Sequence, residues 1–270
     1  MTFKRLTLAA TFLACTLSLL AQKDVLTAKR NVLHNNYNFW VYTPENYEEM
    51  GAETPVIIFL HGASLCGHNL SSVRRYGPLQ AIEMGMRIPA LVIAPQNPGG
   101  SWNPKKLNDL LEWTKQHYAC DSTRVYVLGM SLGGYGTMDF CGTYPEKIAA
   151  GMALCGGTTL KDKKGGLGTL PFWIMHGTAD RAINISRSRD VVNALKAAKE
   201  DTRLRYDWIS GASHGALARL FYVKKTYDWL FSHTTADPER SVNRDITISP
   251  SDTKNAYRSI PKRTHSLQVK

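Results

Sequence analysis

A serine between glycines is the first residue whose setting indicates chemistry. The apolar run 125–128 leads directly into Gly129-Met130-Ser131-Leu132-Gly133, which matches the pattern G-x-S-x-G. In such a strand-to-helix turn the serine backbone is strained and its hydroxyl projects above the strand end, while small flanking residues let strand and helix approach. A hydroxyl held beside a base is a nucleophile for acyl transfer, so Ser131 is the candidate nucleophile.

A second segment, Gly211-Ala212-Ser213-His214-Gly215, matches the same pattern, so the pattern alone does not decide. In folds with this turn, the nucleophile is followed along the chain by an acid and then by a histidine. After Ser213 only Asp228 and His233 remain before the chain changes character, which leaves no room for further strands. The order of residues therefore favours Ser131.

An acid and a base follow Ser131 in the required order. Asp180 comes after the apolar run 172–175 and a glycine turn, and His214 lies in the loop after the run 204–209. The histidine would take the serine proton, and the aspartate would hold the imidazole in the correct tautomer. Competing acids and a competing base are Asp190, Asp201, Asp207 and His176; His176 is better placed to support the Asp180 loop.

Two backbone amides are expected to bind the oxyanion that acyl transfer creates. One is the amide of Leu132, directly after the nucleophile. The other is the amide of Ala63, which follows the apolar run 56–60 and His61-Gly62. In this interpretation His61 shapes the loop and transfers no proton.

Short apolar runs alternate with helical patterns along the chain. Seven segments resemble strands: Tyr37–Tyr42, Val56–Leu60, Ala90–Ala94, Val125–Leu128, Ala150–Leu154, Phe172–Met175 and Leu204–Ile209. Helical spacing is found over Lys106–His117, Ser186–Lys199 and Ala216–Phe231, and a helix is expected after Ser131. Nearly continuous apolar strands separated by helices indicate an α/β fold with a mostly parallel central sheet covered on both faces.

The two ends of the chain differ from the region between them. Residues 1–21 have Lys4 and Arg5 before an apolar run and a small residue, Ala21, which predicts an export signal cleaved near Ala21 and no stable membrane span. Lipidation of Cys15 is the alternative. Residues 22–236 form the expected catalytic domain. Residues 237–270 are polar, basic and contain three prolines, which predicts a loose tail, with 245–249 as a potential edge strand.

Composition restricts the class of protein. The 270 residues are 43% hydrophobic and 20% charged, which is typical of a globular protein, and the formal charge is +11. No basic run with interleaved aromatic residues suggests a nucleic-acid partner. The four cysteines after the signal are Cys66, Cys120, Cys141 and Cys155; their spacing matches no metal pattern, and their pairing and the oligomeric state stay open.

Taken together, the motifs resemble the α/β-hydrolase superfamily. They are Leu60-His61-Gly62-Ala63, Ala94-Pro95-Gln96, Gly129-Met130-Ser131-Leu132-Gly133-Gly134, Tyr144-Pro145-Glu146-Lys147-Ile148-Ala149-Ala150, His176-Gly177-Thr178-Ala179-Asp180 and Ala212-Ser213-His214. Among its members the chain is most similar to the phospholipase/carboxylesterase and dienelactone hydrolase group, including secreted esterases like poly(3-hydroxybutyrate) depolymerases and feruloyl or acetyl xylan esterases. Ser64-Leu65-Cys66-Gly67 departs from the acidic residue or arginine often found after the first His-Gly.

The resemblance implies a serine carboxylesterase that uses Ser131, Asp180 and His214, with Ala63 and Leu132 as oxyanion donors and no cofactor or metal. It also suggests that Trp102 borders the substrate pocket, with loop packing as the alternative role. The expected substrate is a small or polysaccharide-linked ester, because the sequence has no long lid insertion. Two other classes stay open: a serine peptidase of the same fold, and a catalytically silent fold that binds a glycan or a partner.

Overall fold

The computed structural model describes residues 23–270, and the predicted export signal, with Cys15, lies outside them. Nine strands form one sheet in the order β8-β7-β6-β5-β3-β4-β2-β1-β9. Their bounds are β1 Val25–Lys29, β2 Phe39–Thr43, β3 Val56–Leu60, β4 Leu91–Pro95, β5 Val125–Met130, β6 Ala150–Leu154, β7 Phe172–Gly177, β8 Leu204–Ile209 and β9 Gln268–Val269. From β3 to β8 neighbouring strands are parallel, whereas β2 runs antiparallel to β4 and to β1.

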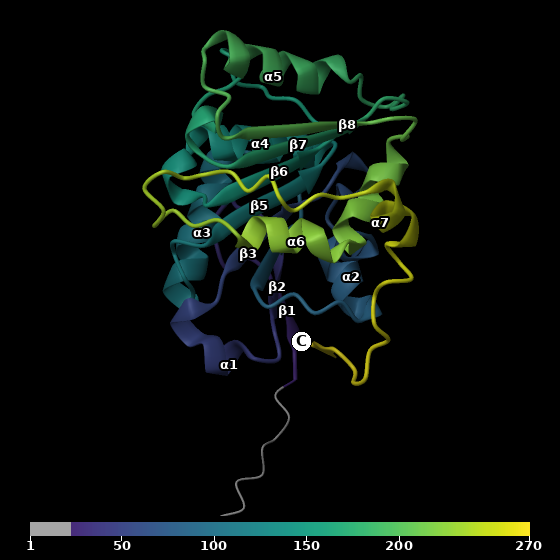
Figure 1. Ribbon diagram of the computed structural model, residues 1–270. Helices are drawn as coiled ribbons and strands as arrows, with labels where there is room; N and C mark the ends of the chain where they lie inside the picture. Colours follow the sequence, from purple (N-terminus) through teal and green to yellow (C-terminus); the bar gives the residue numbers. More distant parts are fainter. Residues whose placement is uncertain (1–22) are drawn as a thin grey trace, which may run out of the picture.

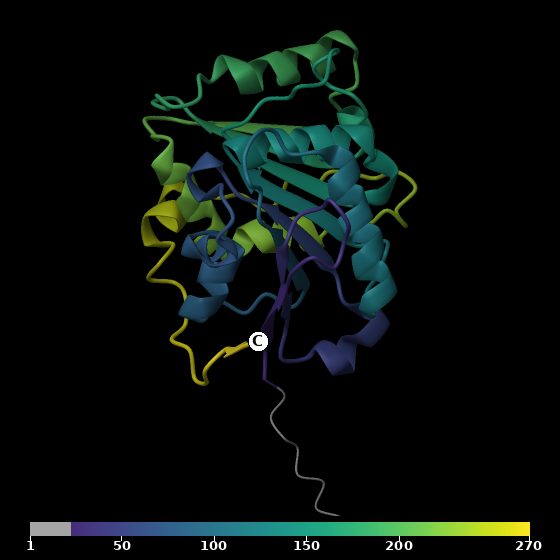
Figure 2. The same cartoon turned by 180° about the vertical axis from the view of Figure 1, so that it is seen from behind.

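Helices cover both faces of this sheet, as the continuous apolar strands predicted. The α-helices are α1 Tyr47–Met50, α2 Pro78–Met84, α3 Pro104–His117, α4 Leu132–Thr143, α5 Ser186–Ala197, α6 Lys224–Phe231 and α7 Pro250–Asn255. Figure 1 shows α6 in front of the strands, and Figure 2 shows the sheet from behind, with α6 now on the far side.

The two faces have separate cores because successive side chains of a strand point to opposite faces. Ile57 and Phe59 of β3 pack on the face covered by α2 and α6. Ile58 and Leu60 pack on the other face, against apolar residues of α3, α4 and α5. Because β3 to β8 are parallel, their carboxyl ends meet at one edge of the sheet, and a packed core lies on each face.

Most of the expected elements are present, with several boundary changes. Strands β3, β6 and β8 have the expected bounds, and the others shift or lengthen by one to two residues. The helix expected over 216–231 is divided at Val223 into a 3-10 segment, Gly215–Tyr222, and α6. Strands β1 and β9 and helices α1, α2 and α7 were not predicted. No strand forms over 245–249, so that expectation was wrong.

The C-terminal segment is not a loose tail, which corrects the expectation from its composition. It runs along one side of the molecule and ends beside β1 in Figure 1, where Gln268 and Val269 pair with β1 as strand β9. Ala256 is fully buried in the core, and Arg205 donates a 2.5 Å hydrogen bond to the carbonyl of Ile246. A few apolar residues at long intervals are enough to attach a segment that looks polar on average.

Two further observations concern residues 23–270. None of their helices combines the length and apolar character needed to cross a bilayer. The four cysteines within this range, Cys66, Cys120, Cys141 and Cys155, are all free thiols.

Candidate active site

Ser131 occupies the tight turn between β5 and α4. Its backbone has φ 58° and ψ −120°, a left-handed conformation that is rare for a residue with a side chain, and its amide donates a 2.9 Å hydrogen bond to the carbonyl of Leu154. Glycines make the turn feasible. A Cβ on Gly129 would lie 2.3 Å from the carbonyl oxygen of Gly133, and one on Gly133 would lie 1.8 Å from that of Leu60.

The two amides predicted to bind an oxyanion belong to elements that meet at Ser131. Leu132 is the first residue of α4, and Ala63 begins a 3-10 turn that ends at Leu65. A Cβ built on Gly62 would lie 3.3 Å from the Cβ of Ser131, which places the loop carrying Ala63 directly beside the serine. The Gly62 amide itself donates to the hydroxyl of Tyr76 at 2.6 Å.

His61 is fully buried and fixes this loop. Its Nδ1 lies 2.8 Å from the carbonyl oxygen of Gly62 and must donate to it, and its Nε2 accepts from the amide of Asn97 at 3.0 Å. Burial lowers the pKa of His61 to about 4, so the ring is neutral at pH 7. The contacts agree with a role in shaping the loop.

Asp180 and His214 form a direct pair. The Nδ1 of His214 lies 2.7 Å from one carboxylate oxygen, and the other oxygen accepts from the amides of Ala182 and Ile183, each at 2.9 Å. Burial alone would raise the pKa of Asp180, but the Ile183 amide, the His214 ring and the Ala182 amide outweigh it and hold the pKa below its usual value. The aspartate side chain is fully buried, whereas that of His214 is 26% exposed.

His176, the competing base, lies behind the pair. It is fully buried, its Nδ1 is 2.8 Å from the Ser188 hydroxyl, and its Nε2 is 3.0 Å from the carbonyl of Ile183 and 3.4 Å from Asp180. Burial lowers the pKa of His176. Nε2 thus supports the Asp180 loop, and Nδ1 is engaged by Ser188 of α5.

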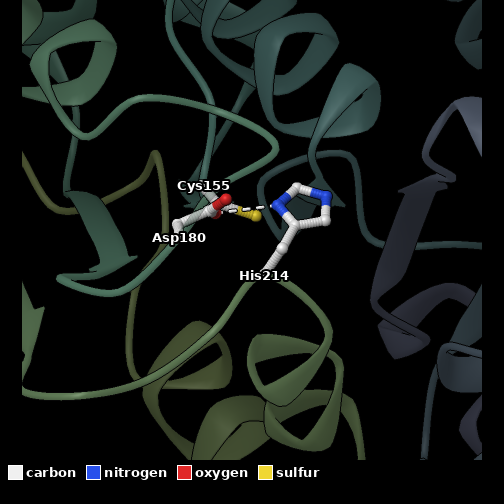
Figure 3. A group of neighbouring side chains, drawn as sticks. All are labelled: Cys155, Asp180 and His214. Carbon is white, nitrogen blue, oxygen red and sulfur yellow. Dashed lines mark hydrogen bonds and ion pairs between the residues drawn. The ribbon is translucent and has the colours of Figure 1, made fainter.

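Sequence reasoning missed the position of Cys155. Its thiol lies beside the pair in Figure 3, and ligand atoms of Cys155, Asp180 and His214 are within 4.8 Å of one another. Cys155 directly follows β6, and the carbonyl before it accepts from the amide of Ser131, so it links the serine turn to the acid–base pair. The sequence did contain a signal for this position: Cys155 follows the carboxyl end of a predicted central strand, as Ser131 follows the end of another.

Trp102 packs within the loops. It is 3% exposed, its indole N–H donates to the carbonyl of His61 at 3.2 Å, and its ring meets that of Tyr37 edge to face with centroids 5.1 Å apart. A Cβ on Gly136 would lie 2.6 Å from the same ring. These contacts are those of loop packing, and a role at the pocket border stays a prediction.

The rival acids have other surroundings. Asp207 accepts a 2.6 Å hydrogen bond from the indole of Trp173, and Asp190 is exposed on α5. The rival serine, Ser213, is exposed as well. At the carboxyl edge of the sheet the structure thus holds a serine in a strained turn and a direct histidine–carboxylate pair, which are the residue types that nucleophilic acyl transfer uses. Among residues 23–270, no hydrogen bond joins the Ser131 hydroxyl to His214.

Comparison with known proteins finds relatives over part of the chain. No protein-family model matches the sequence. Acetylxylan esterase A of Emericella nidulans is 26% identical over 137 residues, 45% of this chain and 42% of the relative. Acetylxylan esterase A of Aspergillus ficuum is 28% identical over 133 residues, which are 43% of this chain and 41% of the relative. The matched part thus spans about two fifths of these relatives.

Solved structures extend the similarity over most of the chain. A thermostable esterase superposes with a TM-score of 0.62 at 24% identity, covering 80% of this chain and 64% of that one. A feruloyl esterase module from Clostridium thermocellum complexed with sinapinate gives a TM-score of 0.58 at 15% identity, covering 84% and 92%. This chain has the α/β-hydrolase fold. A putative dipeptidyl aminopeptidase IV from Bacteroides ovatus has a TM-score of 0.56 at 14% identity, and 77% of this chain matches only 36% of that protein.

Proposed function

We propose that the protein is a serine carboxylesterase with Ser131 as nucleophile, His214 as base and Asp180 as acid. The observation that carries this proposal is the 2.7 Å contact between His214 and Asp180 at the same edge of the sheet as the strained turn of Ser131. Parallel strands β5, β6 and β7 end at that edge, so residues far apart in sequence come together there.

The orientation of His214 assigns its two nitrogens. Nδ1 donates to Asp180, which leaves Nε2 to accept the Ser131 proton as the serine oxygen attacks the ester carbonyl. The Ala63 and Leu132 amides would stabilise the oxyanion. The protonated imidazole returns its proton to the leaving alcohol, and water then enters by the same steps to release the acid and restore Ser131.

The proposed substrates are acetyl or feruloyl esters on a polysaccharide. Sequence relatives named acetylxylan esterase and a structural neighbour named as a feruloyl esterase module support this choice. Export directed by residues 1–21 would bring the enzyme to such a substrate. A serine peptidase of the same fold is the second candidate; the sequence relatives at 26–28% identity are named esterases, whereas the peptidase structure is 14% identical.

Replacing the nucleophile tests the proposal. We expect Ser131→Ala to lower the release of acetate from p-nitrophenyl acetate and acetylated xylan by about 10⁴-fold or more, and to abolish labelling by a fluorophosphonate probe. Ser213→Ala, in the exposed second match of the pattern, is the control and should keep both properties. Full turnover by Ser131→Ala would refute the assignment. Cleavage of dipeptide anilides in preference to esters would favour the peptidase. A wild type that is neither labelled nor active would favour the catalytically silent fold.

A further inference from the structure

Three side chains at the candidate active site are of types that bind metal ions. Two of them, Asp180 and His214, act in the proposed ester hydrolysis, which needs no metal, and the third, Cys155, has no role in it. The sulfur of Cys155, a carboxylate oxygen of Asp180 and a ring nitrogen of His214 all lie within 4.8 Å of one another. Figure 3 shows the sulfur beside the contact between the His214 nitrogen and the Asp180 oxygen. Thiolate, imidazole and carboxylate are together the ligand types that Zn²⁺ takes in proteins.

The spacing of these atoms is close to what zinc requires. With bonds of about 2.0–2.3 Å, two ligands on a tetrahedral zinc ion are roughly 3.3–3.7 Å apart. The 2.7 Å contact between His214 and Asp180 would open slightly, and the more distant pairs within the 4.8 Å limit would close. Side-chain rotations that move these atoms by up to about 1 Å are enough, and water can fill the fourth position.

The fold holds two of the ligands in place and leaves the third reachable. Cys155 has a left-handed backbone, φ 41°, and its amide donates to the carbonyl of Met175 at 2.8 Å. Asp180 is fixed through its second oxygen by the amides of Ala182 and Ile183. The His214 side chain is 26% exposed, so an ion can approach from the side of the histidine.

We propose that Cys155, Asp180 and His214 form a site for Zn²⁺, and that zinc bound there reversibly inhibits the enzyme. The inhibitory part of this inference rests on the proposed function, whereas binding of the ion does not. Zinc on the Nδ1 of His214 moves the ring proton to Nε2, the nitrogen that would take the Ser131 proton. Binding therefore removes the general base without touching the serine.

One proton leaves when the site is loaded. The Nδ1 proton of His214 moves to Nε2, and the Cys155 thiol releases its proton to solvent as sulfur bonds to zinc. Among the described residues, the titratable groups around this thiol are Asp180, His214 and Tyr76, with His176 behind Asp180. Because binding releases the thiol proton, we expect zinc to inhibit more strongly as the pH rises.

Inhibition of turnover is the first test. We expect micromolar free Zn²⁺ to inhibit hydrolysis of p-nitrophenyl acetate by the wild type, and EDTA to restore the rate. Each variant is compared with its own metal-free rate. Cys155→Ala should need about tenfold more zinc or higher for half inhibition. Cys120→Ser is the matched thiol control, half-buried and at the far end of the sheet before β5, and should respond like the wild type.

Direct binding is the second test and needs no activity. Co²⁺ added to the Ser131→Ala protein should give a near-ultraviolet thiolate-to-cobalt charge-transfer band that Zn²⁺ displaces, and the double variant with Cys155→Ala should lack it. A missing band, or equal zinc inhibition of the wild type and Cys155→Ala, would overturn the proposal. If the protein binds Co²⁺ through Cys155 but hydrolyses no ester, the zinc site stands, and the proposed function and the inhibition that rests on it are wrong.

Discussion

The two carboxylate oxygens of Asp180 have different hydrogen-bond partners. One accepts two backbone amides, which fix the side chain, and the other accepts the His214 ring. Because the carboxylate accepts from Nδ1, it selects the tautomer in which Nε2 is free to take a proton. The geometry of Asp180 thus leaves Nε2 of His214 available for its proposed role as a base.

Asp180→Asn should therefore disable catalysis while it preserves shape. The amide can still accept the two backbone N–H groups, but its NH₂ facing the ring favours the wrong tautomer, and we expect kcat for p-nitrophenyl acetate to fall by about 10⁴-fold. Asp190→Asn, on the exposed surface of α5, should keep the wild-type rate. Equal rates for Asp180→Asn and the wild type would show that the pair does not act in turnover.

At the scale of elements, the serine turn depends on close approach of β5, α4 and β3. Gly129 faces the backbone of Gly133, and Gly133 faces the carbonyl of Leu60. These contacts leave no space for even a methyl group. The strand and helix can hold Ser131 in its strained conformation because the backbones around it are in van der Waals contact.

Gly133→Ala should destabilise this region. Its Cβ would lie 1.8 Å from the carbonyl oxygen of Leu60, so backbone must move, and we expect a loss of about 3 kcal/mol or more in the free energy of unfolding by urea. Gly215→Ala is the control, because no atom lies within 4 Å of a Cβ there and the loss should stay within about 1 kcal/mol. Similar losses in both variants would contradict the steric argument.

At the scale of the whole molecule, the C-terminal segment covers one face of the catalytic unit. Its contacts extend from the start of the segment to its end. Arg240 donates to the carbonyl of Pro145 at 3.1 Å, Ala256 is buried, and Arg263 pairs with Asp24 beside β1. This segment therefore stabilises the sheet that positions the site, although it contributes no proposed catalytic group.

A charge placed on the buried side of this segment tests how much the segment contributes to stability. Ala256→Asp puts a carboxylate into the core, and we expect a loss of about 2–3 kcal/mol, seen as a lower Tm. Asn255→Asp, the exposed neighbour on α7, should change stability by no more than about 0.5 kcal/mol. Identical melting curves for the two variants would contradict the docking of this segment and indicate a loose tail.

The attachment of this segment should also weaken in acid. His233 accepts the Asn243 amide at 2.9 Å through Nε2, and burial lowers its pKa to about 4, below the usual 6.5. Between these values the unfolded chain binds a proton that the folded chain excludes, so stability falls as pH falls from about 6.5 to 4. We expect His233→Gln to lose less stability than the wild type between pH 7 and pH 5, by up to about 2 kcal/mol in urea unfolding. An equal loss of stability in the variant and the wild type would show that His233 does not cause the acid sensitivity.

The sequence by itself determined the local features of this protein. Apolar runs identified the central strands, and glycines around Ser131 predicted the turn that the structure contains. Chain order selected Asp180 and His214, which the structure brings to 2.7 Å. The strand and turn predictions were confirmed because buried parallel strands and tight turns restrict residue type over a few neighbouring positions. The catalytic roles of Asp180 and His214 stay a prediction.

Only the tertiary structure decided what depends on contacts between distant segments. Strand β9 and the docking of residues 237–270 rely on sparse apolar and arginine contacts that leave no periodic pattern. The place of Cys155 beside the acid–base pair follows from the order β5-β6-β7 in the sheet, and that of Trp102 from packing against His61 and Gly136. Such neighbours are set by how strands assemble, a long-range property that no short window of sequence contains.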